Sequence, residues 1–368
     1  MKLLIKNAKT VTGEKINIAI KHKKIVYVGQ GLPKDKAAKT IDLKGNSYAS
    51  FGWIDCHVHC YSNMELYGDC PDEIGVKTGV ATVIDAGSCG ADAMPEFYKL
   101  ANKASTNIYA MLNISRVGLI SQDELSNMEN IDHDLALNIF DNYPNFIVGL
   151  KARMSKTVIG NNGIEPLHKA LSLSKDTALP LMVHIGSNPP LLADTLSLLG
   201  YGHIVTHCFN GKANGILDAD TGKIKKEAHQ AYERGVAFDV GHGTDSFNFN
   251  VAEKALAEGI KATSISTDIY SRNRINGPVY NMSTTIEKLL HVGYTLEEAI
   301  EKVTIAPAEL FGLSKKGRLQ EGQDGDITIF DMEHGEKTLT DSNGAMRTIS
   351  LQIKPRYTIV GGSLHECI

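Results

Sequence analysis

Two histidines separated by one residue, His57 and His59, follow an apolar run in the stretch FGWIDCHVHCY at residues 51–61. In a β-strand successive side chains alternate between the two faces, so both imidazoles should point to the same side. Two imidazoles directed at one place suggest a metal site. The same alternation predicts that the thiols of Cys56 and Cys60 point away from the histidines.

Short apolar runs recur after this strand: VATVIDAG, TNIYAMLNIS, FIVGLKARMS, PLMVHIGS, HIVTHCFNG, VAFDVGHGT and ATSISTDIYS. Segments with helical spacing, such as AMPEFYKLANKA and IEPLHKALSLSKDT, separate most of them. This β-α alternation predicts a parallel sheet. We therefore expect an α/β protein whose residues 50–317 form a (β/α)8 TIM barrel.

Both chain ends have a different pattern, with short strand-like runs broken by Gly and Lys turns. Residues 1–49 have this pattern, and it returns after the barrel in GDITIFDM and RTISLQIKPRYTIVGG. We expect residues 1–49 and 318–368 to build one composite β-sandwich domain beside the barrel.

The composition limits the partners and the compartment. The formal net charge is −4, which argues against a nucleic-acid or membrane partner, and no apolar run approaches the length of a membrane span. The N-terminus lacks the apolar core of a signal peptide, and the 6 cysteines form no CxxC pair. We expect reduced thiols, a cytoplasmic location and a small-molecule substrate. Because barrel enzymes of the predicted type are often oligomeric, we also expect a homo-oligomer.

Polar side chains lie at the carboxyl ends of the predicted strands. They are His57, His59, Lys151, Arg153, His184, His207 and Asp268, with His242 just after a further strand. A single histidine in such a place is more often a hydrogen-bonded structural residue. Barrel enzymes keep their active sites at this end, however, so the shared position favours one site. Imidazole and carboxylate are the ligands of zinc and similar divalent ions.

Lys151 requires a separate explanation, because an ammonium group is repelled by a divalent cation. Burial beside cations lowers the pKa of a lysine from its usual value near 10.4. The neutral amine can then take up carbon dioxide and become a carbamate, an anionic ligand with two oxygens. The predicted set then suffices for two metal ions: a histidine pair with Asp268 for one, two further histidines for the other, and the carbamate between them.

Two further positions suggest substrate contacts. Arg153 lies two residues beyond Lys151 on the same strand face, where its guanidinium would bind a substrate carboxylate through two parallel hydrogen bonds. The alternative is an ion pair with a neighbouring acid. In the loop GHGTDSFNF, His242 and the backbone of Gly243 are expected near the mouth of the site. A tightly turned loop with core aromatics is equally compatible with that sequence.

The segments DCHVHC, GLKARM, MVHIG, VTHCFNG and STD occur in the order found in the amidohydrolase superfamily. The whole chain resembles the binuclear branch of that superfamily, as in dihydroorotases and hydantoinases. The resemblance implies a more buried ion, most often zinc, held by His57, His59 and Asp268. It implies a more exposed ion on His184 and His207, with N6-carboxylated Lys151 as the bridge and Asp268 as the proton carrier.

The segments GLKARMS and FDVGHGTDSFNF resemble a subgroup labelled dihydroorotase or adenine deaminase, whose characterised members are similar to deacetylases. The resemblance implies removal of acetyl from α-acetoxy carboxylates such as acetyl-mandelate, and weakly from N-acetyl amino acids. The first alternative is hydrolysis of a cyclic amide. Lys151 argues against a single-metal deaminase, and the filled ligand positions argue against a non-catalytic scaffold.

Overall fold

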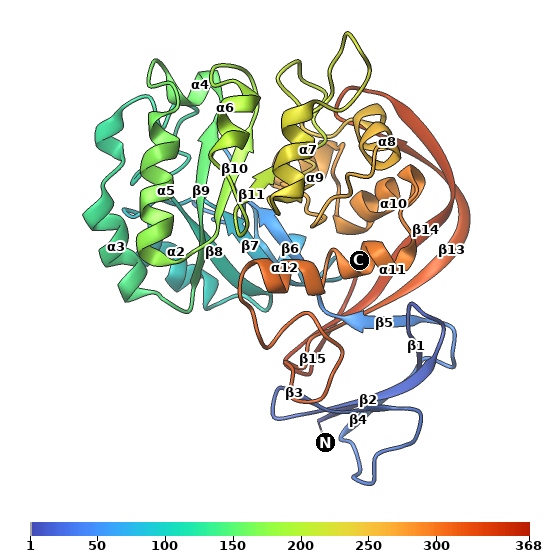
Figure 1. The fold of residues 1–368 in the computed structure, drawn as a ribbon. Helices are drawn as coiled ribbons and strands as arrows, with labels where there is room; N and C mark the ends of the chain where they lie inside the picture. Colours follow the sequence, from blue (N-terminus) through green and yellow to red (C-terminus); the bar gives the residue numbers. More distant parts are fainter. Residues whose placement is uncertain (1) are drawn as a thin grey trace.

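The structure is a computed structural model that describes residues 2–368. Its strands form two sheets, which lie in two lobes of unequal size (Figure 1). In the larger lobe, 7 strands of the described chain pair in parallel and in chain order. They are β6 (Trp53–Val58), β7 (Val80–Ala86), β8 (Asn107–Asn113), β9 (Ile147–Met154), β10 (Leu181–Ile185), β11 (Ile204–Thr206) and β12 (Ala237–Asp239).

The predicted eighth strand is an irregular segment in the structure, residues 264–269. Single parallel bridges join Ser264 to Asp239 at one edge of the sheet and Ile269 to Val58 at the other. The segment therefore spans the gap between β12 and β6. Asp268 has a φ of 50°, in the left-handed region, which a regular strand cannot contain.

Helices cover the outer face of the parallel sheet (Figure 1). The longer ones are α2 (Met94–Ala101), α3 (His133–Asn142), α5 (Glu165–Thr177), α7 (Lys226–Glu233), α8 (Phe249–Ala257) and α10 (Met282–Val292). The shorter ones are α1 (Pro71–Ile74), η1 (Met128–Asn130), α4 (Lys156–Ile159), α6 (Leu192–Ser197), α9 (Ser271–Asn276), α11 (Leu296–Glu301) and α12 (Ile305–Leu310). Each strand has helices on its outer face and the packed barrel interior on its inner face. The strands β6 and β7 are therefore buried along their whole length. No helix among the described residues has both the length and the apolarity to cross a membrane.

The barrel interior is apolar at the amino ends of the strands. Its side chains come from successive strands and include Ile54, Ile84, Met111, Val148, Met182, Ile204 and Ala237. Ala308 of α12, with Phe311 and Leu313 just after it, packs against this cluster. The apolar packing and α12 fill one end of the barrel, so the polar strand-end residues gather at the other.

The smaller lobe is one mixed sheet with strands from both chain ends. Within the described residues it has 8 strands in the order β15-β14-β13-β5-β1-β2-β3, with β4 paired to β1. They are β1 (Leu3–Lys9), β2 (Lys15–Lys21), β3 (Lys24–Gly29), β4 (Lys39–Asp42), β5 (Tyr48–Phe51), β13 (Ile327–Thr340), β14 (Met346–Val360) and β15 (Ser363–Glu366). The two chain ends do share one β unit. Their strands form one continuous hydrogen-bonded sheet, where the sequence led us to expect the two sheets of a sandwich.

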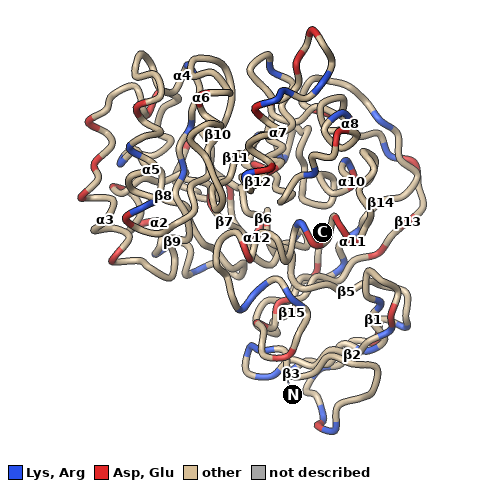
Figure 2. The backbone as a smooth tube through the Cα atoms, viewed as in Figure 1, with Lys and Arg blue, Asp and Glu red and all other residues tan. Residues whose placement is uncertain are grey.

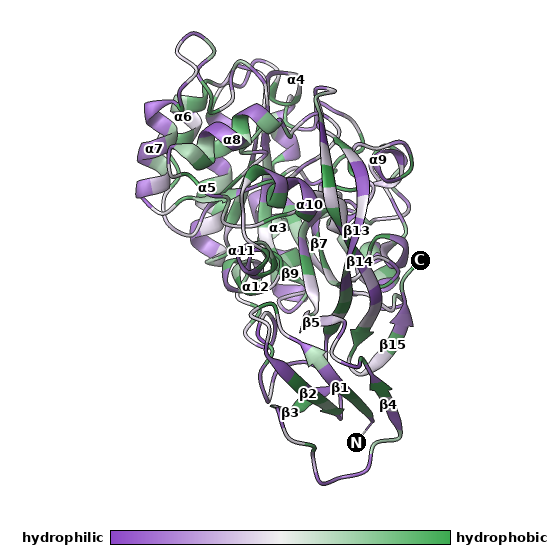
Figure 3. Cartoon of the chain, turned by 90° about the vertical axis from the view of Figure 1, so that its right-hand side faces the viewer, coloured by the Kyte–Doolittle hydropathy of each residue, from purple (hydrophilic) through white to green (hydrophobic). Residues whose placement is uncertain are grey.

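The long hairpin of β13 and β14 extends from this lobe along the side of the barrel (Figure 1). Glu287 of α10 holds it there, because its carboxylate accepts a hydrogen bond from Ile353 N at 2.8 Å and pairs with Lys337 Nζ at 2.6 Å. Hydrophilic and hydrophobic segments alternate along the hairpin (Figure 3). Basic and acidic residues are interspersed in both lobes (Figure 2).

Candidate metal centre

A cavity of about 340 Å³ lies at the carboxyl ends of the barrel strands. All the predicted metal ligands line it: His57, His59, Lys151, His184, His207 and Asp268. A larger hollow of about 830 Å³ lies at the amino ends of β9, β10 and β11, and its lining contains none of these ligands. We therefore place the candidate site in the smaller cavity.

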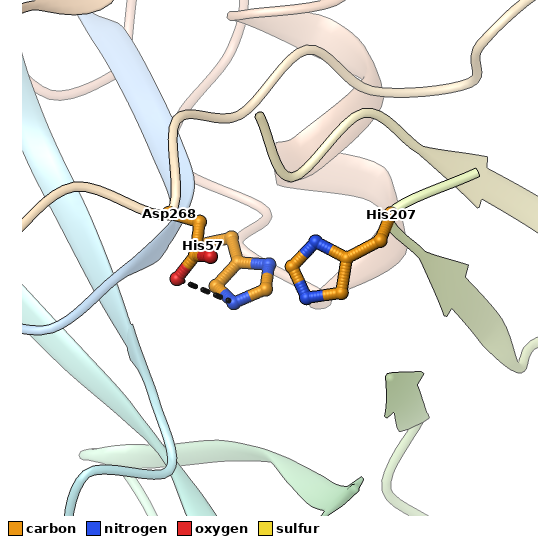
Figure 4. Close-up of side chains that lie close together, drawn as sticks. All are labelled: His57, His207 and Asp268. Carbon is orange, nitrogen blue, oxygen red and sulfur yellow. Dashed lines mark ion pairs between the residues drawn. The ribbon is translucent and has the colours of Figure 1, made fainter. Parts of the chain in front are cut away.

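Three of the predicted ligands form a tight group (Figure 4). One ligand atom from each of His57, His207 and Asp268 lies within 4.8 Å of the other two. Asp268 Oδ1 is 3.4 Å from His57 Nε2 and 3.1 Å from His59 Nε2. The ring of His184 stands edge-on to the ring of His207, with centroids 4.5 Å apart. The structure thus brings the ligands together from four strands and the irregular segment.

The imidazole of His57 is oriented by a buried hydrogen-bond chain. Its Nδ1 lies 2.9 Å from Thr206 Oγ1, and that hydroxyl donates to Asp239 Oδ2 at 2.7 Å. Asp239 is itself fixed by hydroxyl donors from Ser264 at 2.6 Å and Ser266 at 2.7 Å. With Nδ1 engaged in this chain, Nε2 is directed into the cavity.

His59 and His207 are oriented in the same way by different partners. His59 Nδ1 lies 2.8 Å from Ser88 Oγ, which donates to Asp85 Oδ2 at 2.8 Å. His207 Nδ1 donates to the carbonyl oxygen of Gly241 at 2.6 Å. Such partners fix the ring orientation and the tautomer of metal-binding histidines. The residues therefore fit a metal centre.

The protonation states also suit cation binding. Burial holds the pKa of His57 and of His184 well below 6.5, and it lowers the pKa of His207 to about 4. Near neutral pH these rings are neutral, which is the form that coordinates metals. Burial alone would raise the pKa of Asp268, but the neighbouring histidines outweigh it and hold that pKa below its usual range. Asp268 is therefore a carboxylate.

Lys151 meets this group at His57. Its side chain is buried, and its Nζ is 2.9 Å from His57 Nε2. Burial lowers its pKa from 10.5 to about 8. A substantial fraction of the amine is then neutral near physiological pH, as reaction with carbon dioxide requires.

Two of the ligand candidates have unusual backbone conformations. His207 and Asp268 have φ angles of 66° and 50°, where residues other than glycine are rare. Such residues cost on the order of 1–3 kcal/mol each and persist where the surroundings determine them. The Asp268 amide donates to His57 O at 2.6 Å, and its carbonyl oxygen accepts from Asn273 Nδ2 at 2.9 Å. Asp55 holds the preceding residue, because it accepts hydrogen bonds from Thr267 N at 3.1 Å and Thr267 Oγ1 at 2.5 Å. Burial raises the pKa of Asp55 to about 7.

Arg153 lines the cavity, as its position beside Lys151 predicts, but it has a protein partner. Its Nε and Nη2 donate to the two carboxylate oxygens of Glu124 at 2.7 and 2.6 Å. The Glu124 side chain is 0% exposed and that of Arg153 is 12% exposed. The structure therefore contains the ion pair that was the alternative to substrate binding. No local sequence pattern indicates Glu124, because this residue lies in a loop between β8 and α3.

His242 and Gly243 differ from the expected substrate contacts. The His242 ring is buried, stacks on Phe247 and lies 2.7 Å from Lys288 Nζ through its Nε2. The Gly243 amide donates to Thr267 O at 2.9 Å, so it is not free for a substrate. A Cβ on Gly243 would lie 2.5 Å from Asp268 Oδ2, so only glycine fits here. Neither residue lines the cavity, because the loop turns inward to pack behind Asp268.

The expectation for Cys56 was also wrong. Its thiol packs in the barrel interior and donates to Asp239 Oδ1 at 3.6 Å, whereas Cys60 packs in the layer between strands and helices. The register of β6 against β7 shifts between Asp55 and Val58, which interrupts the simple alternation of faces. All six cysteines lie in the described part of the chain and are free.

The hydroxyl partners of the histidines generate a test. We expect Ser88→Ala and Thr206→Val each to weaken metal affinity by about 10–100-fold, because Nδ1 of the ligand loses its partner. Competition with a chelator measures this affinity. Ser174→Ala removes a comparable hydroxyl that bonds Leu179 O far from the cavity, and it should leave the affinity unchanged. Unchanged affinity in both site variants would contradict the orienting role.

Lys288 generates a test of pH dependence. Burial lowers its pKa from 10.5 to about 7, so between these values the unfolded chain binds a proton that the folded chain lacks. The stability of the wild type should therefore rise, relative to Lys288→Met, as the pH increases from about 7 to about 10. Urea midpoints measured across this range test the prediction, with the exposed Lys254→Met as control. A difference in stability between the wild type and Lys288→Met that does not change with pH would contradict the prediction.

Comparisons with known proteins agree with this geometry. A family model described as a deacetylase-like composite domain matches residues 319–366. A deacetylase of Enterococcus faecalis is 56% identical over 99% of each chain, and a deacetylase of Agrobacterium fabrum is 36% identical over 92% of this chain and 83% of that protein. Two solved structures superpose closely. The structure of an adenine deaminase superposes with a TM-score of 0.98, at 56% identity over 99% of each chain. The structure of a dihydroorotase superposes with a TM-score of 0.89, at 34% identity over 99% of this chain and 98% of the dihydroorotase chain. The chain therefore belongs to the amidohydrolase superfamily and is a hydrolase.

Proposed function

We propose that this protein is a binuclear metal-dependent deacetylase that hydrolyses α-acetoxy carboxylates such as acetyl-mandelate and, more slowly, N-acetyl amino acids. The observation that carries the proposal is Lys151, buried with a lowered pKa among imidazoles at the carboxyl end of the barrel. The relatives that are named deacetylases and match nearly the whole chain support this chemistry. The cavity volume suits a small substrate.

The donor set would suffice for two divalent ions, with zinc as the expected metal. His57, His59 and Asp268 would hold one ion, His184 and His207 the other, and carboxylated Lys151 would join them. When bound, such ions lower the pKa of water and polarise a carbonyl group, which supplies a nucleophile at neutral pH.

Asp268 is the residue that moves the proton. Its Oδ1 already lies within 3.4 Å of two imidazole nitrogens, and its pKa below the usual range keeps it in the carboxylate form. We expect Asp268 to take the proton of the attacking water and to deliver it to the leaving alkoxide or amine. Water adds to the acetyl carbonyl, the ester or amide bond breaks, and acetate and the free acid leave.

The sequence predicts Arg153 as a contact of the substrate carboxylate. Its guanidinium faces the cavity, but Glu124 already neutralises it. Hydrolysis of a cyclic amide is the second candidate, because the dihydroorotase structure is 34% identical over nearly the whole chain. The same ligands and the same Asp268 would serve both reactions.

The first experiment is a hydrolysis screen with metal content measured on the same sample. Acetyl-mandelate, N-acetyl-D- and L-amino acids, dihydroorotate and hydantoins are compared side by side. We expect turnover of the acetylated acids, with about two metals per chain. Turnover of the rings alone would move the function to cyclic amide hydrolysis, and removal of the metals should abolish either activity.

The bridging role of Lys151 has its own test. We expect Lys151→Ala to lose bound metal and nearly all activity, because the carbamate ligand cannot form. Added bicarbonate or short-chain acids should restore part of both. The exposed Lys169→Ala of α5 serves as the control. Full metal content and full rate in Lys151→Ala would refute the carbamate.

A further inference from the structure

The positive charges around the cavity differ in their partners. The lysines and arginines that line it are Lys151, Arg153 and Lys212. Lys151 is buried beside His57, and Arg153 is paired on two of its nitrogens with a fully buried carboxylate. Lys212 is partly exposed, and within residues 2–368 no carboxylate pairs with its ammonium group. Lys212 is therefore the cavity cation whose charge is not already used.

The backbone at Lys212 is fixed relative to the metal ligands. Its amide donates to Asn210 Oδ1 at 3.0 Å, and Asn210 Nδ2 donates to the carbonyl oxygen of His207 at 2.8 Å. The Lys212 carbonyl in turn accepts from Gly215 N at 2.8 Å. The loop after β11 thus ties Lys212 to the metal-ligand candidate five positions before it in the sequence, and only the lysine side chain is left to adjust to a ligand.

A carboxylate ligand would find different conditions at the two outer cations. At Arg153 a second carboxylate would meet a guanidinium whose charge Glu124 already neutralises, and whose Nη2 also donates to the carbonyl oxygen of Gln122 at 3.3 Å. The buried Glu124 carboxylate would repel a second negative charge placed beside it. Binding to Lys212 breaks no ion pair. Asp245 also lines the cavity but is exposed and lies outside ion-pair distance of Lys212, so it does not compete for the ammonium group.

We infer that Lys212 is the anchor for the substrate carboxylate and that Arg153 with Glu124 is a neutral part of the cavity wall. This assignment rests on the proposed function, because it concerns the carboxylate of the α-acetoxy acid. The α-carboxylate binds the ammonium group of Lys212, and the acetyl carbonyl is thereby directed toward the group of His57, His207 and Asp268. A substrate without a negative charge gains nothing from this contact.

The test compares an acid with its neutral ester. Binding of mandelate and of methyl mandelate to the zinc-loaded protein is measured by calorimetry, so it does not depend on turnover. We expect Lys212→Met to weaken mandelate binding on the order of tenfold, the loss of one charged hydrogen bond, and to leave methyl mandelate unchanged. Lys212→Arg should keep most of the affinity. Lys223→Met, an exposed lysine outside the cavity lining, should match the wild type.

Three results would overturn the assignment. The first is mandelate affinity that Lys212→Met leaves unchanged, or that the wild type lacks altogether. The second is an equal loss for the acid and the ester. The third is a carboxylate-selective loss in Arg153→Met combined with Glu124→Gln but not in Lys212→Met, which would make Arg153 the anchor.

The two proposals fail separately. Hydrolysis of acetyl-mandelate by the wild type is measured on the same zinc-loaded sample. If mandelate binds through Lys212 but acetyl-mandelate is not hydrolysed, the deacetylase proposal falls and the carboxylate site stands. If acetyl-mandelate is hydrolysed and Lys212→Met has a wild-type Michaelis constant for it, the carboxylate site falls and the deacetylase stands.

Discussion

The candidate metal centre depends on carboxylates buried beneath it. Asp239 accepts hydrogen bonds from hydroxyls of β11 and of the irregular segment, and through Thr206 it orients His57. Asp55 fixes Thr267 from β6, next to Asp268. A buried carboxylate is tolerated only when donors surround it, so each of these acids draws several chain segments to fixed positions. The same hydrogen bonds that close the barrel thereby orient the ligands.

Much of this arrangement follows from the sequence by simple rules. Alternation along strands predicts that Lys151 and Arg153 face one cavity, and the β-α order predicts that the strand ends meet. Both hold, since all the predicted ligands line the same cavity. These predictions succeed because each depends on one strand and on the direction of its chain, which local sequence determines.

The predictions that failed depend on contacts between distant segments. Glu124 reaches Arg153 from a loop, and Lys288 reaches His242 from a helix 46 positions away in the sequence. No local pattern reports either contact. The misplacement of Cys56 has a different origin, since a shift in register between β6 and β7 changes which residues face inward. Alternation holds only while the ladder is regular.

Proteins similar to this chain carry the names of different enzymes. A deacetylase and an adenine deaminase are each 56% identical to this chain, and a dihydroorotase structure is 34% identical. One fold carries several reactions, so the substrate must be argued from the groups that line the cavity. The metal-binding residues activate water for any of these reactions. A cation that a buried acid already neutralises, such as Arg153, adds little to the binding of an acid, whereas Lys212 in the loop after β11 has no carboxylate partner among the described residues. Under the assignment proposed above, that loop, and not the metal centre, would favour substrates that carry a carboxylate.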